Sequence, residues 1–298
     1  MKSAPFDYHA PSTVDETVRL LAGLGDAKVI AGGQSFVPLM ALRLATFEHL
    51  VDLRRVEGIR GIEDRGDHVW VGAATTQATA EHDAIIAAKV PMLAQALPLI
   101  GHFQIRNRGT IGGSLAHADP AAELPAVAAA LDATFEATGP NGQREIPAAD
   151  FFDATFTTAL DEGELLTGIR FPIWAGRCGF AVEEVARRHG DFAIAGAAVG
   201  VQLDDSGAIE RCAIGLFGLG SIPERARAVE RTVIGSAAAD VDTAELGRLA
   251  VDDLGSIPSD LNGSAAYRAR IGAVVVSRAV TRTITIAHDR ARTEAPRG

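Results

Sequence analysis

The hydrophobic pattern of the first 55 residues predicts a small α/β subdomain. Apolar residues from 14 to 24 recur at helical spacing, behind Ser12 and Thr13 and ahead of Gly25, which is typical of a capped helix. The stretches "AKVIAGG" and "HLVDL" predict strands, and "FVPLMALRLA" between them predicts a helix broken around Pro38. Because a strand, a helix and a strand follow in this order, we expect a parallel sheet.

Residues 56–176 predict a mainly antiparallel sheet with helices packed on it. "HVWVGA" alternates as a strand does, while "TTQATAEHDAIIAAKV" and "PMLAQALPLI" have helical spacing. "ATFEATGPNGQREIP" predicts a hairpin that turns at Pro140-Asn141-Gly142, and "ELLTGIRFP" predicts a closing strand.

The pattern after residue 176 predicts a separate C-terminal α+β domain over residues 177–288. Two long strands surround the Asp-Asp-Ser-Gly turn at 204–207, a third strand is expected after them, and three helical segments follow. We therefore expect a three-stranded antiparallel sheet with helices, and a polar tail at 289–298. The fold class predicted for the whole chain is α+β, with domains at 1–176 (subdomains 1–55 and 56–176) and 177–288.

Composition changes this picture by excluding several partners. The 298 residues carry a formal net charge of −10, and the lysines and arginines are scattered, so no basic surface is available for nucleic acid. No apolar stretch is long enough for membrane insertion, and the N-terminus has prolines and acids where a secretory signal would be apolar. We expect a cytoplasmic protein.

The chain also lacks the residue sets of several chemistries. Its two cysteines, Cys178 and Cys212, lie far apart, so the chain cannot ligate an iron–sulfur cluster through four thiolates. His117 and Asp119 share a loop, but two ligands without a third do not predict a metal site. No combination of nucleophile, base and orienting acid is evident, so we predict no catalytic residues.

Two glycine pairs are the strongest candidates for ligand binding. Gly32 and Gly33 stand in "AGGQS", and Gly112 and Gly113 stand in "TIGGS". Adjacent glycines let backbone N–H groups approach a phosphate closely, and a serine and a predicted helix start follow each pair. Either pair alone is also compatible with an ordinary turn, and neither matches a Rossmann or P-loop motif. Together they favour a phosphate-binding cradle built from two distant loops.

At this point the chain resembles a known family, the FAD-binding medium subunits of molybdenum hydroxylases. The resemblance covers nearly the whole chain and rests on these stretches in order: "FDYHAPSTVDE", "AGGQSFVPLMALRLA", "HLVDLR", "VGAATTQ", "QIRNRGTIGGSLAHADPAAELPA", "GELLTGIRFP" and "RRHGDFAIAGAAVG". It implies a two-subdomain FAD-binding region of the PCMH type followed by a smaller C-terminal domain. It also implies one non-covalently bound FAD, whose pyrophosphate and adjoining groups would contact Ala31, Gly32, Gly33, Gln34 and Ser35, and Thr110, Ile111, Gly112, Gly113 and Ser114.

The resemblance implies roles for three more residues. Glu123 would bind the hydroxyl-bearing part of FAD, although a solvated acid at a helix start is the alternative. Leu166 would meet the flavin ring through its backbone or else be an ordinary core leucine. Phe192 would pack near the isoalloxazine or else be a buried strand residue. In addition to these three, Arg106 and Arg108 in "QIRNRGT" are candidates to approach the flavin or a neighbouring subunit, with surface solvation as the default for arginine.

The chain departs from the family pattern in two places. Ser114 stands where asparagine is frequent, which keeps a polar donor but leaves its contact open. The cysteine-bearing insertion of the hydroxybenzoyl-CoA reductase branch is missing, which disfavours that branch.

The function implied by the resemblance is electron transfer. A large molybdenum-cofactor subunit would oxidise the substrate, a small subunit with 2Fe–2S clusters would relay electrons, and FAD in this chain would pass them to an external acceptor. The expected assembly is a dimer of heterotrimers. A self-contained FAD oxidoreductase of the vanillyl-alcohol oxidase type and a non-catalytic subunit are the alternatives. The acceptor and the substrate of the complex stay open.

Overall fold

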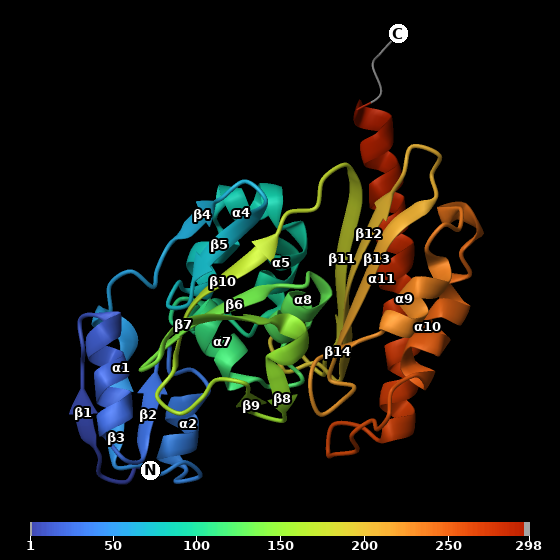
Figure 1. Ribbon diagram of the computed structural model, residues 1–298. Coiled ribbons are helices and arrows are strands. Elements are labelled where there is room, and N and C mark those ends of the chain that lie inside the picture. The colour runs from blue at the N-terminus through green and yellow to red at the C-terminus, as the bar shows by residue number, and fades with distance from the viewer. Residues whose placement is uncertain (1, 295–298) are drawn as a thin grey trace.

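The N-terminal part of the chain is a small parallel sheet with two helices. The computed structural model describes residues 2–294. Three parallel strands lie in the order β1-β3-β2, and α1 and α2 accompany them (Figure 1). Their bounds are β1 Asp7–His9, α1 Val14–Gly23, β2 Ala27–Ile30, α2 Phe36–Ala41 and β3 His49–Asp52. The predicted parallel sheet is confirmed, and so is the capped first helix, where the Thr13 side chain accepts a hydrogen bond from the N–H of Glu16. The helix after Gly33 starts at Phe36 and is not broken, because Pro38 lies in its first turn, where no N–H is needed.

A five-stranded antiparallel sheet follows, in the order β4-β5-β10-β6-β7. Its strands are β4 Ile62–Asp64, β5 His68–Gly72, β6 Thr134–Gly139, β7 Gly142–Pro147 and β10 Leu165–Pro172, and β8 Phe152–Ala154 pairs with β9 Thr157–Thr158 beside it. The predicted hairpin is confirmed, since Gly139 pairs with Gly142 across Pro140 and Asn141. The accompanying helices are α3 Gln77–Glu81, α4 Ala84–Lys89, α5 Pro91–Ala96, α6 Phe103–Arg106, α7 Ile111–His117 and α8 Glu123–Ala130.

The C-terminal sheet has four strands, so the prediction of three was wrong. The strands lie in the order β11-β12-β13-β14, with bounds β11 Arg177–Val185, β12 Ala195–Leu203, β13 Ile209–Phe217 and β14 Glu224–Arg225. The long strand β11 precedes the two strands that surround the Asp-Asp-Ser-Gly turn, β12 and β13, and after β13 the sheet gains only the two-residue β14. Glu183 and Glu184 interrupt the apolar pattern of β11 and hid this strand in the sequence. Short 3-10 turns cover Leu53–Arg55, Leu97–Leu99, Ala148–Asp150 and Ala238–Asp240.

Three helices complete the C-terminal part: α9 Arg227–Val233, α10 Thr243–Asp252 and α11 Ala265–Glu294. The long α11 packs along β11 and β12, and α10 packs against α11 (Figure 1). The helix continues through part of the predicted tail, whose residues 295–298 lie outside the described residues. Within residues 2–294, no helix combines the length and apolarity needed to cross a membrane.

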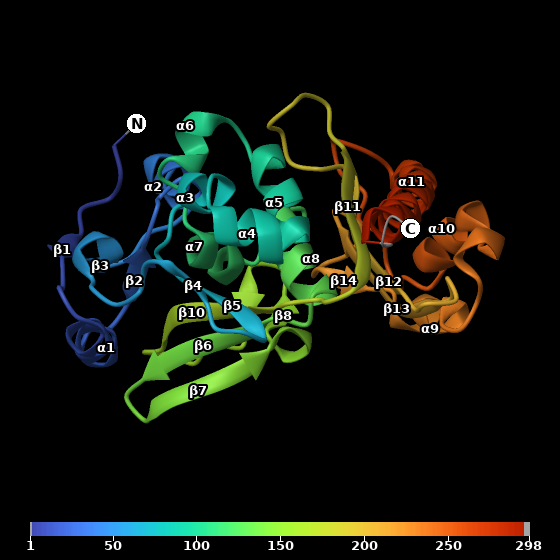
Figure 2. The same ribbon diagram turned by 90° about the horizontal axis from the view of Figure 1, so that it is seen from above.

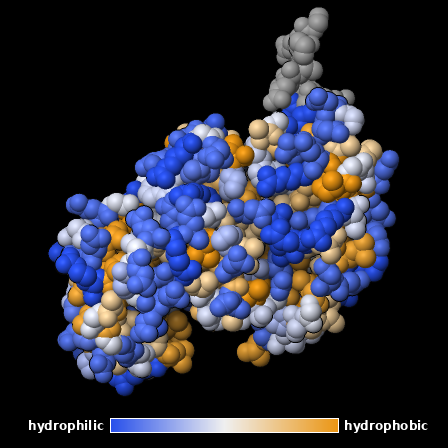
Figure 3. All heavy atoms as spheres, viewed as in Figure 1, coloured by the Kyte–Doolittle hydropathy of each residue, from blue (hydrophilic) through white to orange (hydrophobic). Residues whose placement is uncertain are grey.

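Seen from above, the three units follow one another in a row (Figure 2). Figure 3 shows hydrophilic residues over most of the face presented in the view of Figure 1, with apolar residues in scattered patches. Beneath this surface the main core cluster continues across residue 176, because it includes Phe171 as well as Phe180 and Phe217. We keep the division at 55 and 176 as a proposal for the domain boundaries.

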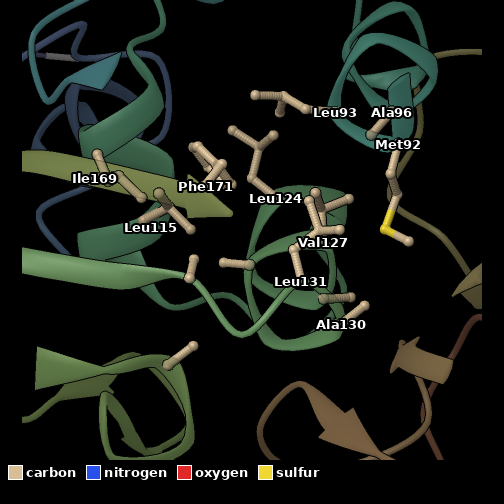
Figure 4. Close-up of a cluster of buried hydrophobic side chains, with 14 of the residues drawn as sticks. Met92, Leu93, Ala96, Leu115, Leu124, Val127, Ala130, Leu131, Ile169 and Phe171 are labelled. Carbon is tan, nitrogen blue, oxygen red and sulfur yellow. The ribbon is translucent and has the colours of Figure 1, made fainter. Parts of the chain in front are cut away.

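Helix α8 is the element that joins the central unit to the C-terminal sheet. All eight of its residues are buried, and it contacts β12, β13 and α5. Figure 4 shows side chains of α8 facing those of α5, α7 and β10 in one apolar cluster. Just after the helix, Asp132 forms ion pairs with Arg225 (2.5 Å) and Arg227 (3.1 Å) of the C-terminal part. These contacts fix the position of α8 and of Glu123 at its start.

Candidate FAD-binding site

The first glycine loop, residues 31–35, lies at the carboxyl end of the parallel sheet. It follows β2 directly, and β2 pairs with β3 so that Ile30 is opposite Asp52. Ligands of parallel sheets bind beyond this edge, where consecutive strand ends leave a crevice. Gly33 has a φ of +73°, a left-handed conformation that glycine adopts without a Cβ penalty.

The backbone of this loop offers hydrogen-bond donors with no protein partner. Within residues 2–294, none of the amide N–H groups of residues 32–35 donates to a protein acceptor. The Ser35 hydroxyl also makes no hydrogen bond in this part of the chain, although Ser35 occupies the N-cap position of α2. Such groups are normally satisfied by water or by a ligand. The loop therefore has the donor pattern that an anion requires.

The second glycine loop, residues 110–114, differs from the first in its position relative to the helix and in the hydrogen bonding of its amides. It forms the first turn of α7 itself, rather than a turn that precedes a helix, and Thr110 is the N-cap. The amides of residues 111–114 already donate to protein acceptors, in order the carbonyl of Thr75, the carbonyl of Ala73, the Thr110 hydroxyl and the Thr110 carbonyl. The expectation that both loops supply free amides is therefore corrected. The second loop offers the Ser114 hydroxyl, which has no partner within residues 2–294.

The two loops pack directly on each other. A Cβ on Gly32 would overlap the carbonyl oxygen of Arg108 and come within 2.7 Å of the Cα of Gly109. A Cβ on Gly113 would lie 3.4 Å from the Cβ of Ala31. Gly32 is therefore required for the packing of the two loops, and Gly113 lies in contact range of the first loop, roles that the phosphate argument from the sequence did not include.

A cavity of about 470 Å³ opens beside the first loop. It is lined by residues 30–34, Val37, Pro38, Asp52, Arg54 and Arg108. Asp52 is buried, accepts a hydrogen bond from the Tyr8 hydroxyl (2.7 Å) and pairs with Arg54 (2.8 Å). Sequence reasoning missed Asp52 and Arg54, although Asp52 lies near the carboxyl end of the predicted strand "HLVDL" and Arg54 directly follows that strand, at the edge where the first loop lies.

Comparison with known proteins identifies the family. Residues 4–174 match the family described as FAD binding domain in molybdopterin dehydrogenase, and residues 180–283 match the CO dehydrogenase flavoprotein C-terminal domain. The chain belongs to the FAD-binding medium subunits of molybdenum hydroxylases, the carbon monoxide dehydrogenase medium-chain family. FAD is thus the cofactor of its N-terminal domain, and the family consists of oxidoreductase subunits.

Similarity to individual members of this family extends over nearly the full chain. The chain is 42% identical to the alpha subunit of the 6-hydroxypseudooxynicotine dehydrogenase complex of Paenarthrobacter nicotinovorans, covering 95% of this chain and 96% of the relative. The structure superposes on a chain of carbon monoxide dehydrogenase from Hydrogenophaga pseudoflava with a TM-score of 0.91 and 39% identity, covering 96% and 99% of the two chains. For quinoline 2-oxidoreductase from Pseudomonas putida 86, the TM-score is 0.90 at 34% identity, with 96% and 99% covered.

The site geometry fits the FAD of this family. Four partner-free amides and a serine hydroxyl suit a pyrophosphate, and the packed glycines keep both loops close enough to meet one cofactor. The cavity beside them is large enough for more than a phosphate group.

Leu166 lies near the second loop, whereas Phe192 lies in the connection between β11 and β12. Leu166 is buried in the main core. The carbonyl of Thr167 accepts a hydrogen bond from the amide of Ala73, and the carbonyl of Ala73 accepts one from the amide of Gly112, which links this strand to the second loop. Phe192 is 58% exposed in the connection between β11 and β12, so the alternative of a buried strand residue was wrong. Its connection reaches the central unit through Gly190, where a Cβ would lie 2.9 Å from the His102 ring.

Glu123 is buried, so the alternative of a solvated helix acid was also wrong. Only 4% of the residue is exposed, and burial raises the pKa of Glu123 to about 8, with the charges of Glu184 and Asp119 acting in the same direction. Glu184 faces it from β11, on the same side of the strand as Phe180 and Val182, and burial raises the pKa of Glu184 to about 7. Its Oε2 atom is buried and has no hydrogen-bond partner in the structure.

Glu184 was missed in the sequence because two adjacent glutamates are typical of solvated positions. The alternation of side chains along a strand could have revealed it. In β11 this alternation places Glu183 beside Arg282 of α11, and it places Glu184 on the same side as the core residues Phe180 and Val182. A negative charge on Glu184 disfavours ionisation of Glu123 and so adds to the effect of burial on the pKa of Glu123.

The remaining candidates are structural. Arg106 pairs with Glu81 at 2.7 Å and also donates to the carbonyls of Ile100 and Gly101. Within residues 2–294, no group of three or more His, Cys, Asp or Glu side chains is arranged to hold a metal ion. For His117 itself, burial lowers the pKa of the imidazole.

Substitution of the second-loop glycine should destabilise the fold. In Gly112→Ala the new Cβ would lie 2.5 Å from the Cβ of Ala73 and 2.7 Å from its Cα, and overpacking of this kind costs about 1–3 kcal/mol. Gly23→Ala is the matched control, because a Cβ there meets nothing within 4 Å and should stabilise by about 0.4–1 kcal/mol. Denaturant unfolding of both variants measures the two effects. A Gly112→Ala chain as stable as the wild type would contradict this packing.

The buried carboxyl pair should make stability fall as pH rises. The pKa of Glu123 is about 8 in the folded chain against 4.5 as its ordinary value, so the folded chain holds the extra proton between these values. The free energy of unfolding should therefore drop between about pH 4.5 and 8, by up to about 1.4 kcal/mol per pH unit.

Glu123→Gln should flatten this dependence, and adding Glu184→Gln should flatten it further in the range up to about pH 7. Denaturant unfolding of the flavin-free chain at a series of pH values measures the slopes. Parallel curves for the wild type and the double variant would contradict the assignment.

Proposed function

We propose that the chain binds one FAD across its two glycine loops and passes electrons from the 2Fe–2S clusters of a small subunit to an external acceptor. A large molybdenum-cofactor subunit would carry the substrate site, and the assembly would be a dimer of heterotrimers. The observation that carries the proposal is the row of partner-free amides at residues 32–35, packed against the segment that holds Gly112 and Gly113. The cytoplasm remains the expected location.

The chain's own residues would bind and orient the cofactor. The first-loop amides and Ser35 would donate to the pyrophosphate, and Ser114 would add a hydroxyl from the facing loop. Glu123, with its pKa of about 8, is a carboxylic acid at neutral pH and can donate a hydrogen bond to a cofactor hydroxyl as well as accept one. Leu166 and Phe192 remain proposals for the flavin end. FAD, once bound, supplies the two-electron redox chemistry.

The names of the relatives favour a subunit over a self-contained enzyme. One relative is a subunit alpha of a dehydrogenase complex, and others are carbon monoxide dehydrogenase medium chains. These names support a role within a larger complex rather than that of a vanillyl-alcohol oxidase type enzyme, which needs its own substrate pocket. The intact first loop also disfavours a non-catalytic subunit that has lost its flavin.

Ser35→Asp should remove FAD without unfolding the chain. Ser35 is exposed, so the new carboxylate is accommodated sterically but opposes the negative pyrophosphate beside the free amides. We expect at least about a tenfold loss of FAD affinity, which corresponds to about 1.4 kcal/mol. Ser256→Asp, an equal charge change at another exposed serine, is the control. A folded Ser35→Asp chain that binds FAD with the dissociation constant of the wild type would rule out the first loop as the pyrophosphate site.

Purification of the native assembly tests the partner proposal. We expect this chain to co-purify with one larger and one smaller polypeptide, together with molybdenum, iron and FAD. Metal analysis and flavin absorbance of the purified complex measure this. A flavin-containing chain isolated without partner subunits or metals would overturn the electron-transfer role but leave the FAD site intact.

A further inference from the structure

Arg108 contacts the first loop through its backbone and also lines the cavity beside that loop. It lies between α6 and α7, two residues before Thr110, and lines the cavity beside Gly32 and Gly33. Its carbonyl oxygen packs on Gly32 so closely that no side chain fits there. The segment that leads into the second loop is therefore in contact with the first loop at this residue.

The charges around the cavity leave Arg108 uncompensated. Asp52 and Arg54 also line the cavity, but they pair with each other at 2.8 Å, and Asp52 accepts further bonds from the Arg54 amide and from Tyr8. Within residues 2–294, no carboxylate lies within ion-pair distance of Arg108, in contrast to Arg106, which is paired with Glu81. The cavity thus carries one net positive charge next to the partner-free amides of the first loop.

A guanidinium in this position is chemically suited to a pyrophosphate. Arginine presents several N–H donors in a planar fork that matches phosphate oxygens, and the attraction needs no prior loss of an ion pair. The amides of residues 32–35 donate hydrogen bonds but carry no full charge. A cation adds a full opposite charge that the amides lack, and of the two arginines that line the cavity Arg108 is the one without an ion pair within residues 2–294.

We propose that Arg108 is the cation that binds the cofactor's pyrophosphate and makes the site prefer FAD to flavins without a phosphate. This inference rests on the proposed function, since it assumes that FAD occupies the cavity. The default assignment of Arg108 as a solvated surface residue is replaced by a binding role. The side chain is exposed, so its contribution depends on ionic strength.

The test compares three ligands on the flavin-free full-length chain by calorimetric titration: FAD, ADP as the pyrophosphate probe, and riboflavin as the probe without phosphate. Arg108→Gln should raise the dissociation constants of FAD and ADP about tenfold and leave that of riboflavin unchanged. Arg108→Lys should restore most of the affinity, because it keeps the charge and loses only the fork. Raising the salt concentration should weaken FAD binding to the wild type more than to Arg108→Gln.

Arg19→Gln is the matched control, because Arg19 is an exposed arginine on α1 that donates a hydrogen bond to the carbonyl of Asp15 and does not line the cavity. Circular dichroism and melting temperature establish that the variants are folded. Equal FAD affinity in the wild type and Arg108→Gln overturns the role of Arg108 while the proposed FAD site stands. An equal loss for FAD and riboflavin also overturns it, because the effect would then not follow the pyrophosphate. A wild-type chain that binds no FAD overturns both proposals.

Discussion

The close packing of Gly32 on the backbone of Arg108 and Gly109 is the contact on which the site depends. It joins the parallel sheet of the N-terminal unit to the segment that starts α7, and any side chain at residue 32 would push the two apart. Because of this contact, Arg108 and residues 31–34 of the first loop line the same cavity, beside the segment that leads into the second loop. A second contact of the same kind, Gly112 on Ala73, fixes the second loop to the central sheet.

The two glycine pairs therefore have different tasks despite their similar sequences. In the first loop the left-handed Gly33 turns the chain and leaves amides without partners. In the second loop the same residue types form a helix start, and the amides of residues 111–114 all donate to acceptors within the protein. Serine follows both pairs, and both serine hydroxyls are without protein partners in the described part of the chain. The two loops are thus not equivalent. The first loop supplies backbone donors for a ligand, and the second loop packs beside it and supplies the Ser114 hydroxyl.

Local patterns in the sequence were sufficient to predict most elements, because helices and half-buried strands have distinct periods. The parallel sheet, the hairpin at Pro140 and the glycine loops followed from such patterns. Strand β11 did not, since Glu184 points into the core at a position where the pattern indicates solvent. Burial of Glu123 and the lack of a partner for Arg108 depend on which distant elements pack nearby. A single sequence carries no direct signal for such contacts.

The central claim is that one FAD occupies the junction of the two loops, and amide hydrogen exchange of the full-length chain tests it most directly. When FAD is added to the flavin-free protein, the amides of residues 32–35 should gain strong protection, because they are the donors without protein acceptors. The amides of residues 111–114 should already be protected before FAD is added and should change little. Unchanged exchange at residues 32–35 with FAD bound would contradict the account.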